Sequence, residues 1–413
     1  MWMIFQKFSK RQILTLTWWN RPQFKNRDGI ICDGSIRSGK TLSMTISFVI
    51  WAMSRYNGQT FALCGKTIEA LRRNVVSHMP VWLGGVVNIV ERRSENKLII
   101  TYKGRTNYFY LFGGKDESSA ALIQGMTLAG VLFDEVALMP RSFVEQALAR
   151  CSVSGSKYWF NCNPEGPLHW FYLEWIQKTA ARNMLYLHFT MTDNLSLAPE
   201  IRRRYEGMYT GVFYSRYILG LWVKAEGLVY SMFDDSKHVV DYVERYSPRH
   251  RYYVSIDYGT VNPFAAGLYD YNPREQCATK FRELYYKGGS ANRVDNEAYY
   301  KMLKELIGDY PITAIIIDPS AAAMIETIQK YGEYTVRGGD NDVLNGIQDV
   351  TKFLNAGCLK IDRNCIHTRE EFKMYCWDDK KTEDAVIKEN DHAMDELRYF
   401  CRTILREELF FIV

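Results

Sequence analysis

A glycine-rich stretch near the start of the chain has the residue types and spacing that hold phosphate groups. The segment GIICDGSIRSGKTLSM contains Gly34, four residues, and then Gly39, Lys40 and Thr41. Apolar runs on both sides predict a strand before the loop and a helix after it. In such a loop the backbone N–H groups face the phosphates, the lysine reaches the terminal phosphates and the hydroxyl binds magnesium. The pattern predicts a P-loop that binds ATP and Mg²⁺.

The four residues between the two glycines complete the predicted phosphate cradle. They are Ser35, Ile36, Arg37 and Ser38. Arg37 adds a positive charge that would lie near the γ-phosphate, either as an internal arginine finger or as a cap on a surface loop. The residues alone leave both interpretations of Arg37 open.

An acidic pair follows a second apolar stretch, LAGVLF, which we expect to form a neighbouring strand. Asp134 would hold the magnesium ion through water, and Glu135 would orient and deprotonate the attacking water. A water-activating base implies hydrolysis of ATP rather than phosphoryl transfer to a small acceptor. A plain strand that ends in a charged turn is the alternative, which the upstream P-loop disfavours.

Two asparagines end a third expected strand, in the segment KYWFNCNPEG. There the amides of Asn161 and Asn163 can sense whether the γ-phosphate is present and couple that state to a moving element. In isolation, a polar turn built from Asn, Pro and Gly explains the same segment equally well.

The segment KENDHAMDELRYF near the end of the chain places two aspartates four residues apart. In a helix, Asp391 and Asp395 would share one face and repel each other. A divalent cation would turn that repulsion into attraction, with Asp395 as the expected ligand and His392 as a neighbour that handles protons. A solvated acidic helix face is the alternative.

Two further aspartates stand at the ends of expected strands. Asp257 follows YYVSI and precedes a turn expected at 259–263, and Asp318 follows ITAIII. Aspartate often ends strands and caps helices, so neither residue is informative alone. Together with Asp395 they would form one cleft that binds two Mg²⁺ or Mn²⁺ ions and cleaves phosphodiester bonds.

The composition is that of a folded protein with two domains. Of the 413 residues, 47% are hydrophobic and 24% charged, and the net charge of +5 permits an anionic partner without requiring one. Nine scattered cysteines form no CxxC pair and no zinc spacing, which fits a reducing cytoplasm. The longest apolar run is too short to span a bilayer, so we expect no membrane partner.

A polar, charged stretch at 229–248 is expected to link the two domains. Before it, 1–228 would form an α/β P-loop ATPase domain with a mostly parallel sheet flanked by helices. After it, 249–413 would form a second α/β domain that carries the carboxylates.

Taken in order, these motifs resemble those of the large terminase subunit of tailed bacteriophages. The similarity covers nearly the whole chain and rests on GSIRSGKT, VLFDEV, NCNP, SIDYG, IIIDPSAA and KENDHAMDELRY. Proteins of that family are packaging motors in which a P-loop ATPase domain is joined to an RNase H-like nuclease domain. The resemblance implies that the chain cuts concatemeric phage DNA and drives it into the procapsid through the portal.

The resemblance also implies roles for individual residues. Carried over by position, these are ATP and magnesium binding by Lys40 and Thr41, the Walker B pair Asp134 and Glu135, the coupling motif at Asn161 and Asn163, the metal carboxylates Asp257, Asp318 and Asp395, and the neighbouring His392. Gln124 stands where some relatives carry arginine, which leaves the source of the arginine finger open. Gln23 is a candidate for recognising adenine.

The implied partners are double-stranded DNA, a small terminase subunit and the portal protein, on which the chain would act as a homo-oligomeric ring. The implied location is the cytoplasm of the infected bacterial host, with transient attachment at the procapsid portal and absence from the mature virion. Two other functions stay open. One is a non-cutting translocase or helicase with a DNA-binding rear domain, and the other is a capsid- or portal-associated structural protein that binds nucleotide for stability.

Overall fold

The computed structural model describes residues 7–259, 263–286, 294–381 and 383–409. Residues 260–262, the middle of the turn expected at 259–263, lie outside the described residues. Helices and strands are interspersed along the described chain, as expected for an α/β protein.

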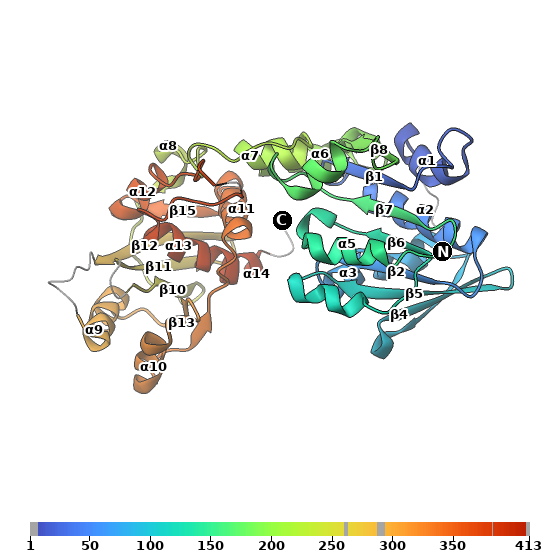
Figure 1. Ribbon diagram of the computed structural model, residues 1–413. Coiled ribbons are helices and arrows are strands. Elements are labelled where there is room, and N and C mark those ends of the chain that lie inside the picture. Colours follow the sequence, from blue (N-terminus) through green and yellow to red (C-terminus); the bar gives the residue numbers. More distant parts are fainter. Residues whose placement is uncertain (1–6, 260–262, 287–293, 382, 410–413) are drawn as a thin grey trace. The chain divides into compact units, whose positions relative to one another are not determined.

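The chain folds into two compact units (Figure 1). The first comprises Met1–Glu206 and Val212–Lys224, and the second comprises Gly207–Gly211 and Ala225–Val413. The stretch 229–248, expected as a linker, lies within the second unit. Its short strand β9 (Val239–Val240) pairs in parallel with β15 (Leu359–Asp362).

An eight-stranded sheet forms the first unit, in the order β3-β4-β5-β2-β6-β7-β1-β8. The β3-β4 and β4-β5 pairings are antiparallel and the others are parallel, which confirms the expected mostly parallel sheet. Parallel strands share one carboxyl edge, so the residues that follow β1, β6 and β7 meet there. The strands are β1 (Gly29–Gly34), β2 (Thr60–Gly65), β3 (Asn88–Arg92), β4 (Lys97–Tyr102), β5 (Arg105–Gly113), β6 (Gly130–Phe133), β7 (Lys157–Asn161) and β8 (Met184–Phe189).

Seven α-helices lie in the described chain between Lys10 and Phe213, and the helix predicted after the glycine-rich loop is among them. It begins at Lys40, directly after Gly39, whose φ of 83° is one that L side chains rarely adopt. The helices are α1 (Lys10–Thr17), α2 (Lys40–Arg55), α3 (Ile68–Asn74), α4 (Met79–Leu83), α5 (Arg141–Ala149), α6 (Pro199–Met208) and α7 (Gly211–Phe213).

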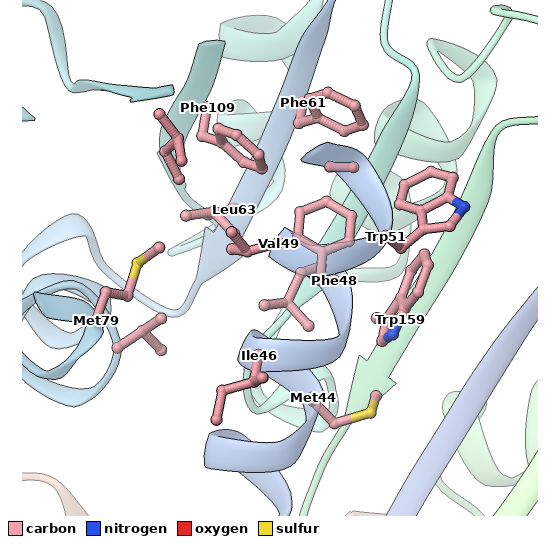
Figure 2. Packing of buried hydrophobic residues seen from close by; sticks show 14 of the residues in the cluster. Met44, Ile46, Phe48, Val49, Trp51, Phe61, Leu63, Met79, Phe109 and Trp159 are labelled. Atoms are coloured by element: carbon pink, nitrogen blue, oxygen red, sulfur yellow. The ribbon is translucent and has the colours of Figure 1, made fainter. Parts of the chain in front are cut away.

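Buried apolar residues point to both faces of the first sheet, and helices pack on both faces. Along β1, Ile30 belongs to the core cluster that contains α2, and Ile31 belongs to the cluster that contains α5. Phe48 of α2 packs its ring against those of Phe61 and Trp159 (Figure 2). Because α2 is anchored through its buried face, the loop at its N-terminus is held in a fixed place on the sheet edge.

A seven-stranded mixed sheet forms the second unit, in the order β14-β13-β10-β11-β12-β15-β9. Strands β10 and β13 are parallel neighbours in which Ile256 pairs with Ile317, so the next residue of each strand reaches the same edge. That edge therefore receives Asp257 and Asp318. Besides β9 and β15, the strands are β10 (Arg251–Asp257), β11 (Phe264–Asn272), β12 (Cys277–Tyr286), β13 (Ile312–Ile317) and β14 (Val336–Gly338).

One face of the second sheet is covered by helix α13, which carries the acidic motif. Ser255 donates a hydrogen bond to the carbonyl oxygen of Glu396 at 2.6 Å, and the ring of Tyr269 stacks on Phe400 at 3.8 Å. Asp257 shares the face of Ser255 because residues two apart in a strand point the same way. The helices are α8 (Asp235–His238), α9 (Asn296–Ile307), α10 (Ala322–Tyr331), α11 (Val343–Asn355), α12 (Ile366–Phe372), α13 (His392–Phe400) and α14 (Arg406–Glu408).

Candidate functional site

A cavity of about 770 Å³ opens at the carboxyl edge of the first sheet. It is large enough for a nucleotide, since small-molecule pockets span roughly 300–1,000 Å³. Its wall combines the glycine-rich loop with the ends of β6 and β7. The lining residues are Lys7, Phe8, Gln12, Ile36, Arg37, Ser38, Gly39, Lys40, Thr41, Leu42, Asn74, His78, Trp82, Asp134, Glu135, Asn161, Asn163, Asn194 and Ser196.

The Lys40 ammonium lies inside the loop and is almost fully buried. It donates to the carbonyl oxygens of Gly34 at 3.0 Å and Ser35 at 2.7 Å, and to the amide oxygen of Asn163 at 3.1 Å. Burial lowers the pKa of Lys40, and nearby acidic groups, including Glu135, oppose that shift. Oxygen acceptors of the loop and of Asn163 therefore hold this positive charge in place.

Two residues of the predicted cradle attach the loop to neighbouring segments of the first unit through their backbone N–H groups. The N–H groups of Ser35 and Ile36 donate to the carbonyl oxygens of Phe189 and Tyr217, each at 2.9 Å. Gly34 is required because a Cβ there would come within 1.9 Å of the Phe189 carbonyl oxygen. Within the glycine-rich loop, the residues that line the cavity begin at Ile36.

One hydrogen-bonded group in the cavity wall joins Thr41 of α2, Asp134 after β6 and Asn161 at the end of β7. The Thr41 hydroxyl donates to Asp134 at 3.1 Å, and the Asn161 amide donates to the same carboxylate oxygen at 2.7 Å. Burial raises the pKa of Asp134, and these two hydrogen bonds oppose the shift. A hydroxyl beside a carboxylate is a donor set that suits Mg²⁺.

Glu135, directly after Asp134, is partly buried at the cavity and lies beside Asn161. Its backbone is left-handed, with φ of 61°, and its N–H donates to the Asn161 amide oxygen at 3.3 Å. Burial, followed by repulsion from Asp134, raises the pKa of Glu135 to about 7, while Lys40 and Arg73 act in the opposite direction. A carboxylate with a pKa near neutrality is poised to accept a proton from water.

Arg37 lines the cavity, but its guanidinium is engaged by another part of the first unit. It donates to the Tyr205 hydroxyl at 2.7 Å and lies over that ring at 5.1 Å. Gln23 is exposed and is not among the described residues that line the cavity. Gln12 lines it instead, with its amide nitrogen 2.4 Å from where a Cβ on Gly39 would lie.

The second sheet gathers the remaining predicted residues at its own edge. Asp257 accepts a hydrogen bond from His392, with 2.8 Å between Oδ2 and Nδ1. Burial raises the pKa of Asp257, and the His392 contact opposes the shift. On the neighbouring strand, Asp318 accepts from the Tyr399 hydroxyl at 3.2 Å and from the Ser320 N–H at 2.7 Å. These hydrogen bonds lower the pKa of Asp318 although partial burial works against them.

The acidic motif differs from the expected one in where its helix begins. The helix starts at His392, so Asp391 is its N-cap residue, and the two aspartates are not two positions within one helix. The carboxylate of Asp395 pairs with Arg398 at 2.9 Å and with Lys388 at 3.0 Å. Asp391 pairs with the same Lys388 ammonium at 3.2 Å. The repulsion between the two acids is thus relieved by cationic side chains.

The carboxylates suit a hard divalent cation by type but are already partnered. Asp257, Asp318 and Asp395 all lie near Tyr399, whose pKa is raised by burial and then by these acids. Within the described ranges, no three His, Cys, Asp or Glu side chains are gathered closely enough to hold an ion. Asp257, Asp318 and Asp395 therefore lie around Tyr399 without forming a closed ligand set. Cationic or imidazole side chains, namely His392, Lys388 and Arg398, engage two of the three acids.

Glu371 on α12 is a residue of this edge that the sequence analysis missed. Its carboxylate accepts from the N–H groups of Ala393 at 2.7 Å and Met394 at 3.2 Å, and it is buried. Glu371 therefore caps α13 from outside, while Asp391 makes no side-chain cap. No local signal connects EEF at 370–372 to a helix twenty residues later, so only the fold reveals the pairing.

Similarity to known proteins extends over nearly the whole chain. A family model described as terminase large subunit, T4likevirus-type, N-terminal, matches residues 31–236. The large terminase of a thermophilic bacteriophage is 50% identical, with a TM-score of 0.91 over 97% of this chain and 100% of that one. The chain belongs to the large terminase family.

Other structures of the same thermophilic phage's large terminase, in complex with ADP and with ATP-γ-S, are each 49% identical with TM-scores of 0.87. Each covers 97% of this chain and 100% of its own. No curated protein matches the chain. Among the described residues of this family member, no helix is both long and apolar enough to cross a membrane.

Replacing Glu371 by alanine should loosen the start of α13. Two buried N–H groups would lose their acceptor, which costs roughly 1–3 kcal/mol of unfolding free energy. Glu371→Gln keeps an acceptor oxygen and should lose less. Hydrogen exchange at Ala393 and Met394 and urea unfolding measure the effect. Glu370→Ala, on the exposed neighbour, is the control, and equal protection in Glu371→Ala and the native chain would contradict the capping role.

Proposed function

We propose that the chain is an ATP-driven motor that packages double-stranded phage DNA and also carries an endonuclease. The observation that carries this proposal is the group of Lys40, Thr41, Asp134 and Asn161, with Glu135 beside it, at the edge of a parallel sheet. Membership of the large terminase family supports the same assignment. The relative from the thermophilic phage was solved with ADP and ATP-γ-S, which supports nucleotide binding by this chain.

In the ATPase half, the loop residues would bind and orient the triphosphate. Lys40 would exchange its carbonyl partners for phosphate oxygens, and Thr41 and Asp134 would hold Mg²⁺, which neutralises charge on the phosphates. Glu135 would take a proton from the attacking water, because its raised pKa matches neutral pH. Arg37 would have to leave Tyr205 to act as an arginine finger.

Asn161 and Asn163 would couple nucleotide state to the protein. Asn163 contacts the Lys40 ammonium, and Asn161 contacts Thr41, Asp134 and the backbone of Glu135. A triphosphate that draws Lys40 away would break its bond to Asn163, and loss of the γ-phosphate would restore it. Asn161 and Asn163 would therefore sense the γ-phosphate through hydrogen bonds that exchange partners.

In the second unit we propose an RNase H-like nuclease. Asp257, Asp318 and Asp395 would hold two divalent cations, which when bound activate water and stabilise the leaving oxygen. His392 would position Asp257 through their hydrogen bond and handle a proton near the reacting water. The positions of Asp257 and Asp318 on neighbouring parallel strands support a shared site.

The proposed partners follow from this activity. Double-stranded DNA is the substrate of both halves and would be gripped mainly through its phosphates. A small terminase subunit would select the DNA, and the portal of the procapsid would hold a homo-oligomeric ring of this chain. We propose that the chain acts in the cytoplasm of the infected bacterium and attaches to the procapsid only during packaging.

One observation favours a second candidate function, a translocase that does not cut. The oxygens of Asp395 are paired with Arg398 and Lys388, so a metal ion would have to compete for them. In a non-cutting motor these pairs would be permanent and the second unit would only bind DNA. The nuclease assay below separates the two functions.

The raised pKa of Glu135 predicts an acidic limit to ATP hydrolysis. The protonated carboxyl cannot accept a proton, so kcat/KM should fall as the pH drops through about 7. Glu135→Gln should bind ATP but turn it over about 10²–10⁴-fold more slowly. Phosphate release measured from about pH 6 to pH 8 checks both results, with the exposed Glu145→Gln as the control. A flat profile in the native chain would exclude Glu135 as the base.

The nuclease proposal predicts metal-dependent nicking of supercoiled plasmid. With Mg²⁺ or Mn²⁺ the native chain should convert the plasmid to open circles, and Asp395→Asn should not. Asp349→Ala is a matched control, because Asp349 is also a buried helical aspartate paired with an arginine and a lysine, Arg402 and Lys352. Absence of cutting with either metal, in a chain that hydrolyses ATP, would favour the non-cutting translocase.

A further inference from the structure

A single ammonium group bridges the two carboxylates at the start of α13. The Lys388 Nζ lies 3.2 Å from Oδ2 of Asp391 and 3.0 Å from Oδ2 of Asp395. Both aspartates are buried, with exposed fractions of 4% and 8%. Buried like charges need compensation close by, and Lys388 supplies it to both at once.

The two cations that contact Asp395 differ in how freely they can leave. Arg398 binds Oδ1 at 2.9 Å, and its side chain is only 2% exposed, so it is packed inside the second unit. The Lys388 side chain is 58% exposed, and its flexible stem can carry the ammonium into solvent by rotating. Arg398 is therefore a fixed partner of Asp395, and Lys388 is an exchangeable one.

The buried Asp391 carboxylate forms an ion pair with Lys388. An aspartate at the N-cap normally accepts from the first free N–H groups of its helix. Here Glu371 accepts from those groups, and Asp391 makes no side-chain cap. Among the described residues, Lys388 is the only cation within 4 Å of Asp391. The Asp391 carboxylate is thus left directed at the same ammonium that occupies Asp395.

We propose that Lys388 is the resident counter-ion of the carboxylate site, and that a divalent cation must displace its ammonium from Asp391 and Asp395 to bind. This inference rests on the proposed nuclease function and concerns the regulation of that same site. Lys388 keeps the site charge-balanced and folded without metal. The same contacts weaken metal binding, so the site is loaded only when the cation concentration is sufficient to compete.

Binding of Mn²⁺, followed by the loss of its free-ion EPR signal, tests the inference without any cutting assay. Lys388→Met and Lys388→Gln remove the charge and should each bind Mn²⁺ roughly three- to tenfold more tightly than the native chain. Both variants should melt at a lower temperature without metal and regain stability when Mn²⁺ is added. Lys388→Arg keeps a cation and should not tighten binding.

Lys373→Met is the matched control, because the Lys373 side chain is also 58% exposed and also pairs with an aspartate, Asp235. Its Mn²⁺ affinity should equal that of the native chain. Native or weaker affinity in Lys388→Met and Lys388→Gln would overturn the inference, provided that the native chain binds Mn²⁺ and Asp395→Asn does not. If the native chain itself binds no Mn²⁺ at this site, the nuclease proposal fails together with the inference.

Discussion

The Lys40 ammonium is held almost completely out of water, and the elements around it are arranged to satisfy that charge. Backbone carbonyls of the loop accept from it on one side, and Asn163 accepts on the other. Asn163 follows β7, so the charge ties the loop after β1 to a neighbouring strand end. A buried cation without such acceptors would be too costly to fold. In the proposed ATPase the ammonium would exchange these acceptors for phosphate oxygens.

The second unit meets the same constraint with the opposite sign. Parallel strands β10 and β13 bring Asp257 and Asp318 to one edge, and α13 adds Asp395 above it. These negative charges are balanced by cationic or hydrogen-bonding side chains, chiefly His392 and Arg398, in addition to Lys388. In both units, charged side chains that are buried or partly buried lie close to the carboxyl edge of a sheet, and each has a charged or hydrogen-bonding partner.

Much of the fold could be predicted because its signals are local. The P-loop pattern needs only eight neighbouring residues, and apolar runs that end in aspartate mark the strands before Asp134, Asp257 and Asp318. The expectation that these strand ends carry functional side chains then follows from parallel pairing. The roles of the individual site residues are proposals that the experiments above address.

What could not be predicted depends on contacts between distant residues. Arg37 meets Tyr205 across 168 positions of sequence, and no pattern in the loop announces that partner. Glu371 lies on α12 and contacts α13 because the fold brings the two helices together. The role proposed for Lys388 follows only from its contacts with two aspartates. Gln12 of α1 lines the cavity, whereas Gln23, the candidate for recognising adenine, does not line it.

The chain is proposed to carry two chemically independent sites, and an assay of both activities on variants of each site is the sharpest test of their independence. ATP turnover and plasmid nicking would be measured side by side on Lys40→Ala and Asp257→Asn. If the sites are independent, Lys40→Ala should lose ATP turnover but still nick the plasmid, and Asp257→Asn should lose nicking but still hydrolyse ATP. Loss of both activities in both folded variants, or of neither in either, would contradict this prediction.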